Sequence, residues 1–223
     1  MIKLGIAGTD TEVGKTIVAA AILARLRKRG LRVSAMKPIE TGVPPGTDPS
    51  DAAILRAAAG NVDALEDVCP LIFADPVAPL VAASRTRRAI DLVALDAILA
   101  RLSRGRDALV VESAGGLLTP IDDAIAFDGL FHRWGLDLVI VAANRLGALN
   151  HTVLTVRAVE RAGLRVRAIV LNDLHNGSPD IAMLTNLPTL RRLLPETLVL
   201  SFPYVPPPHN PDTLAEFLEW DPK

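Results

Sequence analysis

Near its start the chain carries Gly8-Thr9-Asp10-Thr11-Glu12-Val13-Gly14-Lys15-Thr16, between an apolar run and a helical pattern. In such a strand–loop–helix unit, the backbone N–H groups of the loop and the helix N-terminus converge on phosphate oxygens. Lys15 can reach the β- and γ-phosphates, and the Thr16 hydroxyl can bind Mg²⁺. The strict pattern G-x-x-x-x-G-K-S/T would need glycine at position 9, where this chain has Thr9. We therefore expect a nucleoside triphosphate site on a relaxed phosphate-binding loop (P-loop).

Outward from this loop, short apolar runs alternate with helical patterns along the chain. We expect strands at residues 3–7, 31–36, 107–112, 136–143, 166–171 and 198–201. We expect helices at residues 16–29, 92–102, 124–133, 150–162 and 185–194, and a helix beginning at Asp51 with Ser50 as its N-cap. This alternation indicates βαβ units and a parallel sheet covered on both faces. The expected fold class is α/β, a P-loop NTPase-like three-layer sandwich with a mostly parallel central sheet; residues 61–90 show no assignable pattern.

Composition excludes several classes of protein. Of the 223 residues, 50% are hydrophobic and 22% are charged, which excludes a disordered chain. The single cysteine, Cys69, excludes an internal disulfide and a cysteine-cluster zinc site. A net charge of −1 gives no electrostatic footprint for nucleic acid or an anionic membrane. With no signal-peptide pattern at the start, we expect a cytoplasmic protein with one domain over residues 1–223.

Lysine is scarce, which draws attention to where it occurs. Only five of the 24 basic residues are lysine, and Lys15 and Lys37 both follow apolar runs. If the strand before Lys37 lies next to the P-loop strand, its ammonium would meet and stabilise a transferring phosphoryl group. Thr41, four residues later, would then hydrogen-bond a substrate. The structural alternative for Lys37 is a lysine that merely ends a strand.

Two acids are candidate metal ligands. Glu112 ends an expected strand and is followed by Ser113-Ala114-Gly115-Gly116, a tight loop that suits close approach to phosphate. An acid at this place commonly holds Mg²⁺ beside the P-loop hydroxyl; the alternative is an acid that faces water. Asp51 is in the first turn of a helix, where the helix dipole alone favours an acid. Its role as a ligand or a purely structural residue stays open at this stage.

Other P-loop classes fit less well. Partition-type ATPases carry an extra lysine five places before the P-loop lysine, where this chain has Asp10. Guanine recognition uses Asn-Lys-x-Asp, and the nearest sequence, Asn144-Arg145-Leu146-Gly147, lacks the acid. A kinase-type lid could be formed by Arg85-Thr86-Arg87-Arg88, although a solvated basic patch near a helix start is the simpler explanation of this cluster. The four histidines lack ligand spacing, so we expect no zinc site; they are His132, His151, His175 and His209.

These motifs together resemble the dethiobiotin synthetase family of biotin synthesis. The resemblance rests first on the P-loop combined with Lys37-Pro38-x-x-Thr41-Gly42. It continues in the family's order at Ser50-Asp51-Ala52, Val111-Glu112-x-Ala114-Gly115-Gly116, Leu146-Gly147-x-x-Asn150-His151, Asn172-Asp173 and Pro203-Tyr204. The matching motifs therefore run from residue 8 to about residue 205.

The resemblance implies an enzyme, an ATP- and CO₂-dependent cyclo-ligase that uses Mg²⁺. Its substrate would be 7,8-diaminononanoate, of which one amine takes up CO₂ as a carbamate. ATP then phosphorylates the carbamate, and the second amine closes the ureido ring with release of ADP and phosphate. Members of this family are homodimers that hold the far end of the substrate near the partner subunit's loop at residues 147–151.

The resemblance also assigns roles by position. It implies that Lys15 and Lys37 are catalytic and that Thr16, Asp51 and Glu112 hold the metal. The implied ATP-binding residues are Glu12, Val13, Gly14, Lys15, Thr16, Ile17, Asp51, Glu112, Ser113, Ala114, Gly115, Asn172, Asp173, Pro203, Tyr204 and Val205. The implied substrate-binding residues are Thr41, Gly147, Asn150 and His151.

The chain departs from the family pattern at a few positions. Ala78-Pro79-Leu80 stands where members often have Ser-Pro-His, so a substrate-side contact is lost or replaced. Ser113 stands where glycine is common, and Arg145 replaces a frequent lysine. Two other functions stay open on sequence alone: another ATP-dependent kinase or synthetase of the same fold, and a partition-type ATPase switch.

Overall fold

A central parallel sheet organises the molecule. In the computed structural model, which describes residues 1–218 and 220, the strands of this sheet follow the order β2-β5-β1-β6-β7-β8, with every neighbouring pair parallel. Their bounds are β1 (Ile2–Gly8), β2 (Val33–Met36), β5 (Ala108–Gly116), β6 (Asp137–Ala143), β7 (Val166–Asn172) and β8 (Val199–Phe202). A second, small parallel sheet pairs β3 (Ile39–Thr41) with β4 (Leu71–Phe73). The predicted α/β class is confirmed.

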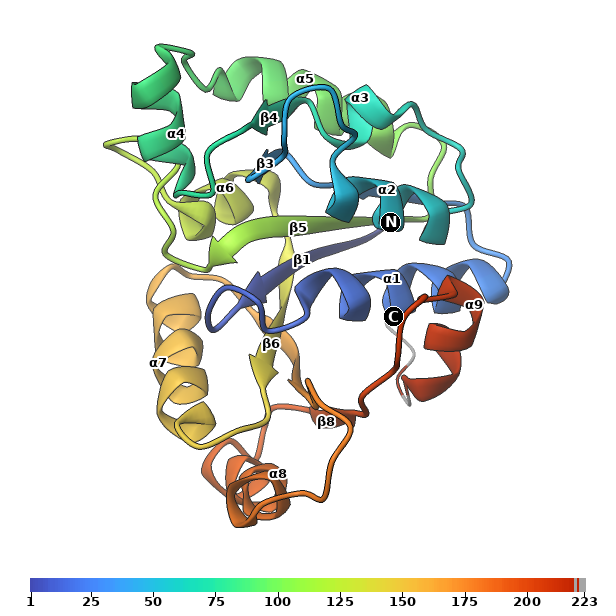
Figure 1. Cartoon of the computed structure of the whole chain (residues 1–223), viewed down its shortest axis with the longest axis vertical. Coiled ribbons are helices and arrows are strands. Elements are labelled where there is room, and N and C mark those ends of the chain that lie inside the picture. The colour runs from blue at the N-terminus through green and yellow to red at the C-terminus, as the bar shows by residue number, and fades with distance from the viewer. Residues whose placement is uncertain (219, 221–223) are drawn as a thin grey trace.

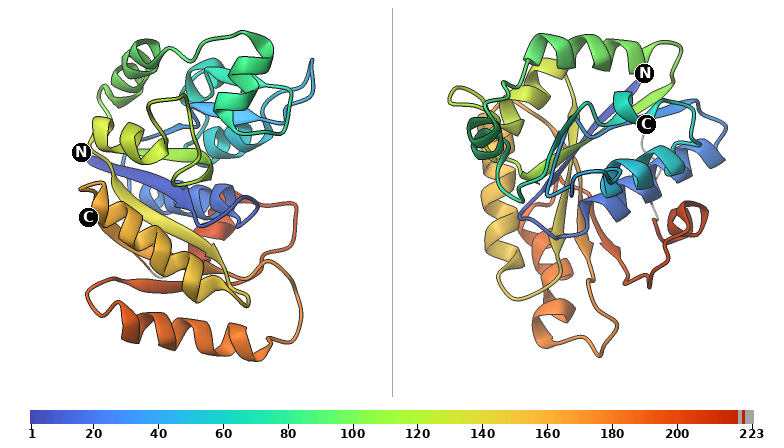
Figure 2. Two further views of the ribbon diagram at one scale, coloured as in Figure 1. Left: turned by 90° about the vertical axis from the view of Figure 1, so that its left-hand side faces the viewer. Right: turned by 45° about the horizontal axis from the view of Figure 1, so that its top comes forward.

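Helices cover both faces of the central sheet (Figures 1 and 2). On one face lie α1 (Lys15–Lys28), α2 (Ser50–Ala58), α3 (Leu65–Val68), α9 (Pro211–Leu214) and the short 3₁₀ helix η1 (Ala215–Phe217). On the other face lie α4 (Pro79–Thr86), α5 (Leu92–Ser103), α6 (Phe127–Trp134), α7 (Ala148–Arg161) and α8 (Ile181–Leu193). The result is the three-layer sandwich that the sequence predicts.

The strands feed two separate cores because their side chains alternate between the faces. In β6, for example, Val139 and Val141 pack with α1, whereas Leu138 and Ile140 pack with the helices of the opposite face. These strand residues are fully buried. Both faces therefore bury apolar side chains, which explains why the strands are continuous apolar runs in the sequence.

The strand order differs from expectation at one important place. The strand before Lys37 was expected beside the P-loop strand, but β5 lies between β2 and β1. Consecutive strands are neighbours only about two-thirds of the time, and the fully buried run Ala108–Val111 makes β5 well suited to an interior position. Lys37 is thus separated from the P-loop by the strand that carries Glu112.

Other local expectations are also corrected. Residues 61–90 form α3, β4 and α4, and β5 continues through Gly116, so Ser113 to Gly116 extend a strand and are not a separate loop. Ser50 is the first residue of α2 and not its N-cap, a position that Pro49 occupies. The helices expected to begin at residues 124, 150 and 185 begin at Phe127, Ala148 and Ile181. Among the described residues, the structure contains no helix both long and apolar enough to cross a membrane.

Candidate active site

The P-loop connects β1 to α1 at the carboxyl edge of the sheet. Gly14 is the N-cap of α1 and has a φ of 84°, the left-handed region that glycine adopts without strain. A Cβ at this position would also collide with the side-chain amide of Asn172. That amide donates a hydrogen bond from Nδ2 to the carbonyl of Val13 at 3.0 Å, so the end of β7 holds the loop. The N-terminus of α1 is therefore presented by a backbone shape that the surrounding residues fix.

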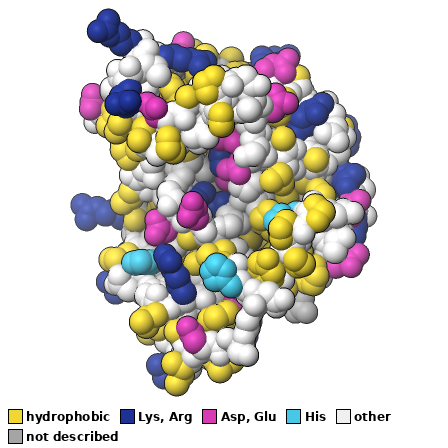
Figure 3. Space-filling model, viewed as in Figure 1, with side chains coloured by type: hydrophobic (Ala, Val, Ile, Leu, Met, Phe, Trp, Pro, Cys, Tyr) yellow, Lys and Arg dark blue, Asp and Glu magenta, His cyan; other side chains and the backbone are white. Residues whose placement is uncertain are grey.

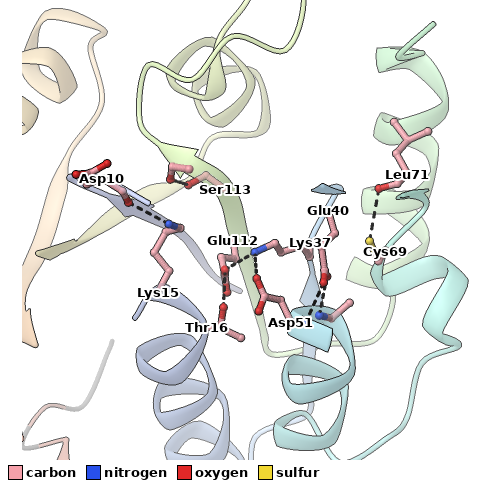
Figure 4. Close-up of polar contacts among 12 residues, drawn as sticks. Asp10, Lys15, Thr16, Lys37, Glu40, Asp51, Cys69, Leu71, Glu112 and Ser113 are labelled. Atoms are coloured by element: carbon pink, nitrogen blue, oxygen red, sulfur yellow. Dashed lines mark hydrogen bonds and ion pairs between the residues drawn. The ribbon is translucent and has the colours of Figure 1, made fainter. Parts of the chain in front are cut away.

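Lys37 is the centre of a buried ionic cluster (Figure 4). Its Nζ donates to Glu112 Oε1 at 2.5 Å and to Asp51 Oδ2 at 2.6 Å. The Thr16 hydroxyl donates to the same Glu112 oxygen at 2.9 Å. Because Met36 pairs with Val111 in the sheet, Lys37 and Glu112 are the next residues on adjacent strands. The cluster thus joins four elements: the end of β2, the first turn of α2, β5 and the start of α1.

Burial in this cluster is unequal. The side chains of Lys37 and Glu112 are 4% and 0% exposed, whereas that of Asp51 is 38% exposed. Glu112, expected at a strand end with water as one alternative, lies in mid-strand and is fully buried. The Asp51 carboxylate is therefore the part of the cluster that opens towards solvent.

The two lysines of the site differ in acidity. Burial lowers the pKa of Lys15, and the charge of Lys37 adds to this, against the opposing effect of the nearby acids. Burial alone would lower the pKa of Lys37 as well. The charges of Glu112 and Asp51 and their hydrogen bonds outweigh it, so the pKa of Lys37 is raised above its ordinary value. Lys37 is consequently a fixed positive charge at neutral pH and cannot serve as a base there.

A cavity of about 810 Å³ opens over these groups, and its hollow gathers acidic and basic side chains with a histidine close by (Figure 3). The predicted site residues that line it are Glu12, Gly14, Lys15, Thr16, Ile17, Lys37, Thr41, Asp51, Glu112, Ala114 and Gly115. Residues from the β4–α4 connection, Pro76 to Pro79, form the opposite wall. The P-loop, the lysines and both acids thus share one space of the size that ligand pockets commonly have.

The donor set fits Mg²⁺. Glu112 Oε2 is buried and, within the described part of the chain, finds no hydrogen-bond partner. The described residues contain no group of three or more His, Cys, Asp or Glu side chains suited to a metal. Mg²⁺ typically needs only one or two carboxylates, because waters and substrate phosphates complete its shell. Glu112, Asp51 and the Thr16 hydroxyl supply that kind of oxygen set beside a phosphate loop.

Some predicted residues lie behind the cavity wall. Val13 and Ser113 are buried, and the Ser113 hydroxyl donates to the carbonyl of Gly115 at 3.1 Å. Asn172 braces the P-loop, and Asp173 accepts a hydrogen bond from Asn144 at 2.8 Å. None of these four residues is among those that line the cavity in the described part of the chain.

Other predicted residues lie away from the cavity. In the described part of the chain, neither Pro203 to Val205 nor the trio Gly147, Asn150 and His151 lines it. The trio lies at the start of α7, where Asn150 and His151 are exposed. The arginines of the possible lid have local partners: Arg85 pairs with Asp75, and Arg88 lies over the Phe73 ring. The described structure therefore gives the lid interpretation no support.

Sequence reasoning missed several residues of the site. His209 lines the cavity and donates from Nε2 to the carbonyl of Val205 at 3.0 Å, but its sequence spacing gave no signal. Thr11, Ile54, Thr119 and the wall at residues 76–79 also line it. Of these, Thr11 was within the P-loop motif, and Ala78 and Pro79 were noted only as departures. A wall formed by an irregular segment has no periodic pattern to reveal it.

Comparisons with known proteins agree with this geometry. A family model described as an AAA domain matches residues 3–212. The ATP-dependent dethiobiotin synthetase of Anaeromyxobacter sp. (strain K) is 45% identical over 169 residues, covering 76% of this chain and 75% of that protein. The corresponding synthetase of Serratia marcescens is 35% identical over 193 residues, with 85% of each chain covered. The ATP-dependent dethiobiotin synthetase BioD 1 of Escherichia coli (strain K12) is 32% identical over 213 residues, covering 94% of this chain and 93% of that protein.

One solved structure supports the fold alone. The signal recognition particle receptor FtsY of Elizabethkingia anophelis superposes with a TM-score of 0.51 at 14% identity. The match covers 96% of this chain and 64% of the receptor, so the chain spans under two-thirds of that structure's length.

Proposed function

The chain belongs to the family of ATP-dependent dethiobiotin synthetases, and from that membership we propose that it is the ATP- and Mg²⁺-dependent ligase that forms dethiobiotin in biotin biosynthesis. The observation that carries the proposal is the position of Lys37. Its ammonium lies between Glu112 and Asp51 in the same cavity as the P-loop lysine, Lys15. Two cations and two acids that line one cavity suit phosphoryl transfer, which depends on positioning and charge neutralisation.

The proposed reaction has three steps. One amine of 7,8-diaminononanoate adds to CO₂ and loses a proton, giving a carbamate. A carbamate oxygen attacks the γ-phosphorus of ATP, and ADP leaves. The second amine then attacks the carbonyl carbon of the phosphorylated carbamate, expels inorganic phosphate and loses a proton, which closes the ureido ring.

We assign the chain's residues to these steps by their positions. Lys15 and the α1 N-terminus bind the phosphates, and Lys37 stabilises the carbamate and the transferring phosphoryl group. Bound Mg²⁺ would neutralise phosphate charge, held by Thr16, Asp51 and Glu112. Thr41, which also lines the cavity, contacts the substrate. From the family pattern, and not from the cavity lining, we place Asn172, Asp173 and residues 203–205 on the adenine side. Of these, Val205 is bonded to His209, which does line the cavity.

We further propose a homodimer. Gly147, Asn150 and His151 do not line the cavity of their own chain as described, although the family pattern gives them a substrate role. Leu146 and Leu154, beside and within α7, are 85% and 55% exposed, which suits a covered surface. A partner would bring residues 147–151 to the far end of the substrate. We also propose one ATP-binding ligase domain over residues 1–223.

The test of the activity is product formation. Purified protein with Mg²⁺-ATP and bicarbonate is assayed for ADP release with and without 7,8-diaminononanoate, and for dethiobiotin by mass spectrometry. We expect diamine-dependent ADP release with dethiobiotin as product, and loss of both in Lys37→Ala. Nucleotide binding without diamine-dependent turnover would discard the substrate. A phosphorylated product without ring closure would favour a kinase.

The dimer has its own test by complementation. Lys37→Ala and Asn150→Ala are each expected to be inactive or weakly active alone. A mixture that exchanges subunits should regain activity, because one of its two sites would combine an intact Lys37 with an intact Asn150. A monomer in sedimentation analysis, or no recovery on mixing, would contradict a shared site.

A further inference from the structure

Glu40 is a buried acid next to the site that does not belong to the cavity lining described above. It lies in β3, three residues after Lys37, and is 5% exposed. Its Oε1 accepts a hydrogen bond from the backbone N–H of Asp51 at 3.1 Å, and its Oε2 accepts one from the N–H of Ala52 at 3.0 Å (Figure 4). Both carboxylate oxygens thus engage the first turn of α2.

These two bonds replace a cap that α2 lacks locally. The first N–H groups of a helix have no partner within the helix and need an acceptor from elsewhere. The N-cap residue of α2 is Pro49, whose side chain carries no acceptor. Glu40 supplies the acceptor from another element, and its negative charge also opposes the positive end of the helix dipole. A cap from 11 residues away fixes not only the helix end but also where that end lies relative to β3.

The N–H of Asp51 that Glu40 fixes belongs to the residue whose carboxylate reaches Lys37. Asp51 Oδ2 lies 2.6 Å from Lys37 Nζ. The backbone N–H of Lys37 is itself held by the carbonyl of Val68 at 2.7 Å. Lys37 and Glu40 therefore belong to one short segment whose backbone is fixed at Lys37. Lys37 contacts the side chain of Asp51, and Glu40 contacts its backbone N–H. Two residues three positions apart thus hold both the side chain and the backbone of Asp51.

We propose that Glu40 is a positioning residue that acts through Asp51: by bridging two N–H groups of α2, it holds the Asp51 carboxylate where it can share the nucleotide-bound Mg²⁺ and the Lys37 ammonium. The inference rests on the proposed function, because the metal role of Asp51 is part of it. Glu40 itself touches neither nucleotide nor metal. Neither the P-loop motif nor the Lys37 motif indicates that Asp51 needs this support from Glu40, because the contact forms only where β3 and α2 meet.

The test compares Glu40→Gln with a matched cap variant. Asp91, the N-cap of α5, is also a carboxylate that bonds two N–H groups of a helix start: its Oδ1 accepts from Val93 at 2.9 Å and from Ala94 at 3.0 Å. Because α5 does not contribute to the cavity, Asp91→Asn removes the charge of a helix cap, as Glu40→Gln does, and leaves the site alone. The measurement is the Kd of Mg²⁺, by isothermal titration calorimetry, for protein saturated with a non-hydrolysable ATP analogue. The thermal midpoint Tm is measured in parallel.

We expect Glu40→Gln to weaken Mg²⁺ binding by about 10-fold, the scale typical of residues that orient a metal ligand. Asp91→Asn should lower Tm and leave the Kd of Mg²⁺ unchanged. In an Asp51→Asn background, Glu40→Gln should add little further loss, because a residue acting through Asp51 is not additive with it. If Glu40→Ala does not fold, Glu40→Gln still decides the question, since it keeps one acceptor oxygen.

Two results would overturn the inference. One is a Glu40→Gln protein with lower Tm and an unchanged Kd for Mg²⁺, which would make Glu40 a structural cap like Asp91. The other is a full additional loss in the Asp51→Asn background, which would mean that Glu40 acts independently of Asp51. Because the Mg²⁺ titration needs no turnover, a protein that forms no dethiobiotin but shows this pattern would refute the proposed function and leave the inference standing.

Discussion

Two helices, α1 and α2, begin at the same cavity, and their N-termini are treated in opposite ways. The N-cap of α1 is Gly14, which has no side chain, and its first turn carries Lys15 and Thr16 and no acid. The N-cap of α2 is Pro49, its first N–H groups are bonded by Glu40, and its first turn carries Asp51. The positive end of α1 is left for an external anion, whereas that of α2 is neutralised from within.

The difference shows how one fold separates an anion site from a cation site a short distance apart. An open helix N-terminus with a lysine attracts phosphate. At the N-terminus of α2, the carboxylate of Glu40 neutralises the helix dipole. The carboxylate of Asp51 is therefore not held by that dipole and can interact with a cation. Lys37 and Glu112 lie between the two ends and connect them. Each of the following changes alters one end and spares the other.

The largest expected effect follows from removing the cation at the α1 end. Lys15→Ala should reduce turnover by about 10²–10³-fold, the scale for loss of one charge-stabilising donor in a transition state, and should weaken binding of the ATP analogue. The Glu40–Asp51 end should be intact, so Tm should change little. Steady-state kinetics and calorimetry measure the effect, and unchanged nucleotide affinity would mean that Lys15 does not reach the phosphates.

A second change closes the α1 end with a methyl group. Gly14→Ala places a side chain at a φ of 84° and against the Asn172 amide. We expect about 1–3 kcal/mol of backbone strain and a loss of nucleotide binding. The double variant with Asn172→Ala should recover part of the stability, since the collision is relieved but the positive φ is not. Urea denaturation of the single and double variants measures this, and full recovery would show that φ is unimportant here.

A third test uses pH to separate the two lysines. The pKa of Lys15 is lowered, chiefly by burial, whereas the pKa of Lys37 is raised because its acid partners outweigh burial. As pH rises, Lys15 should therefore lose its proton first, and affinity for the ATP analogue should fall while Lys37 stays charged. In Lys15→Arg, whose guanidinium keeps its charge, affinity should be lower overall but flatter with pH. A parallel decline in both proteins would assign the titration to another group.

The smallest expected effect concerns the α2 end. Cys69 follows α3, and burial raises its pKa to about 12. A thiol titrating at about 8.5 when unfolded binds its proton more tightly in the folded protein. Its contribution to stability is therefore complete below that pH and is lost as pH rises towards 12. At pH 8, labelling of Cys69 by a thiol reagent should be slow. The labelling rate should be modestly higher in Glu40→Gln than in Asp91→Asn. Equal rates in the two variants would mean that the reactivity of Cys69 does not depend on the α2 end.

The sequence predicted much of the fold because its signals are local. Apolar runs and helical periodicity located every strand of the central sheet and all of its longer flanking helices, with errors of a few residues at the ends. The same approach failed on residues 61–90. The short elements there are too brief to show a periodicity, and the three-residue strand β4 depends on β3 as its pairing partner.

In the site too, residues with a local sequence signal were predicted, and residues that depend on distant contacts were not. P-loop spacing predicted Lys15 and Thr16, scarce lysine drew attention to Lys37, and the end of an apolar run indicated Glu112. These four residues do share a cavity. His209, Pro76 and Val77 went unpredicted, and Ala78 and Pro79 were singled out only as part of a departure from the family pattern. All of these residues approach the P-loop from distant parts of the chain. Glu40 was invisible for a related reason. An acid in a short strand gives no sign that it caps a helix elsewhere.

What the residues alone specify is therefore the set of elements and the chemistry of the phosphate loop, because hydrophobic period, loop spacing and residue type are properties of neighbouring positions. What needs the folded chain is the strand order that inserts Glu112 between Lys37 and the P-loop, and the bond from Glu40 to α2. Both depend on which distant surfaces bury the most apolar area and on which buried donors then need an acceptor. Those conditions exist only once the layers have packed.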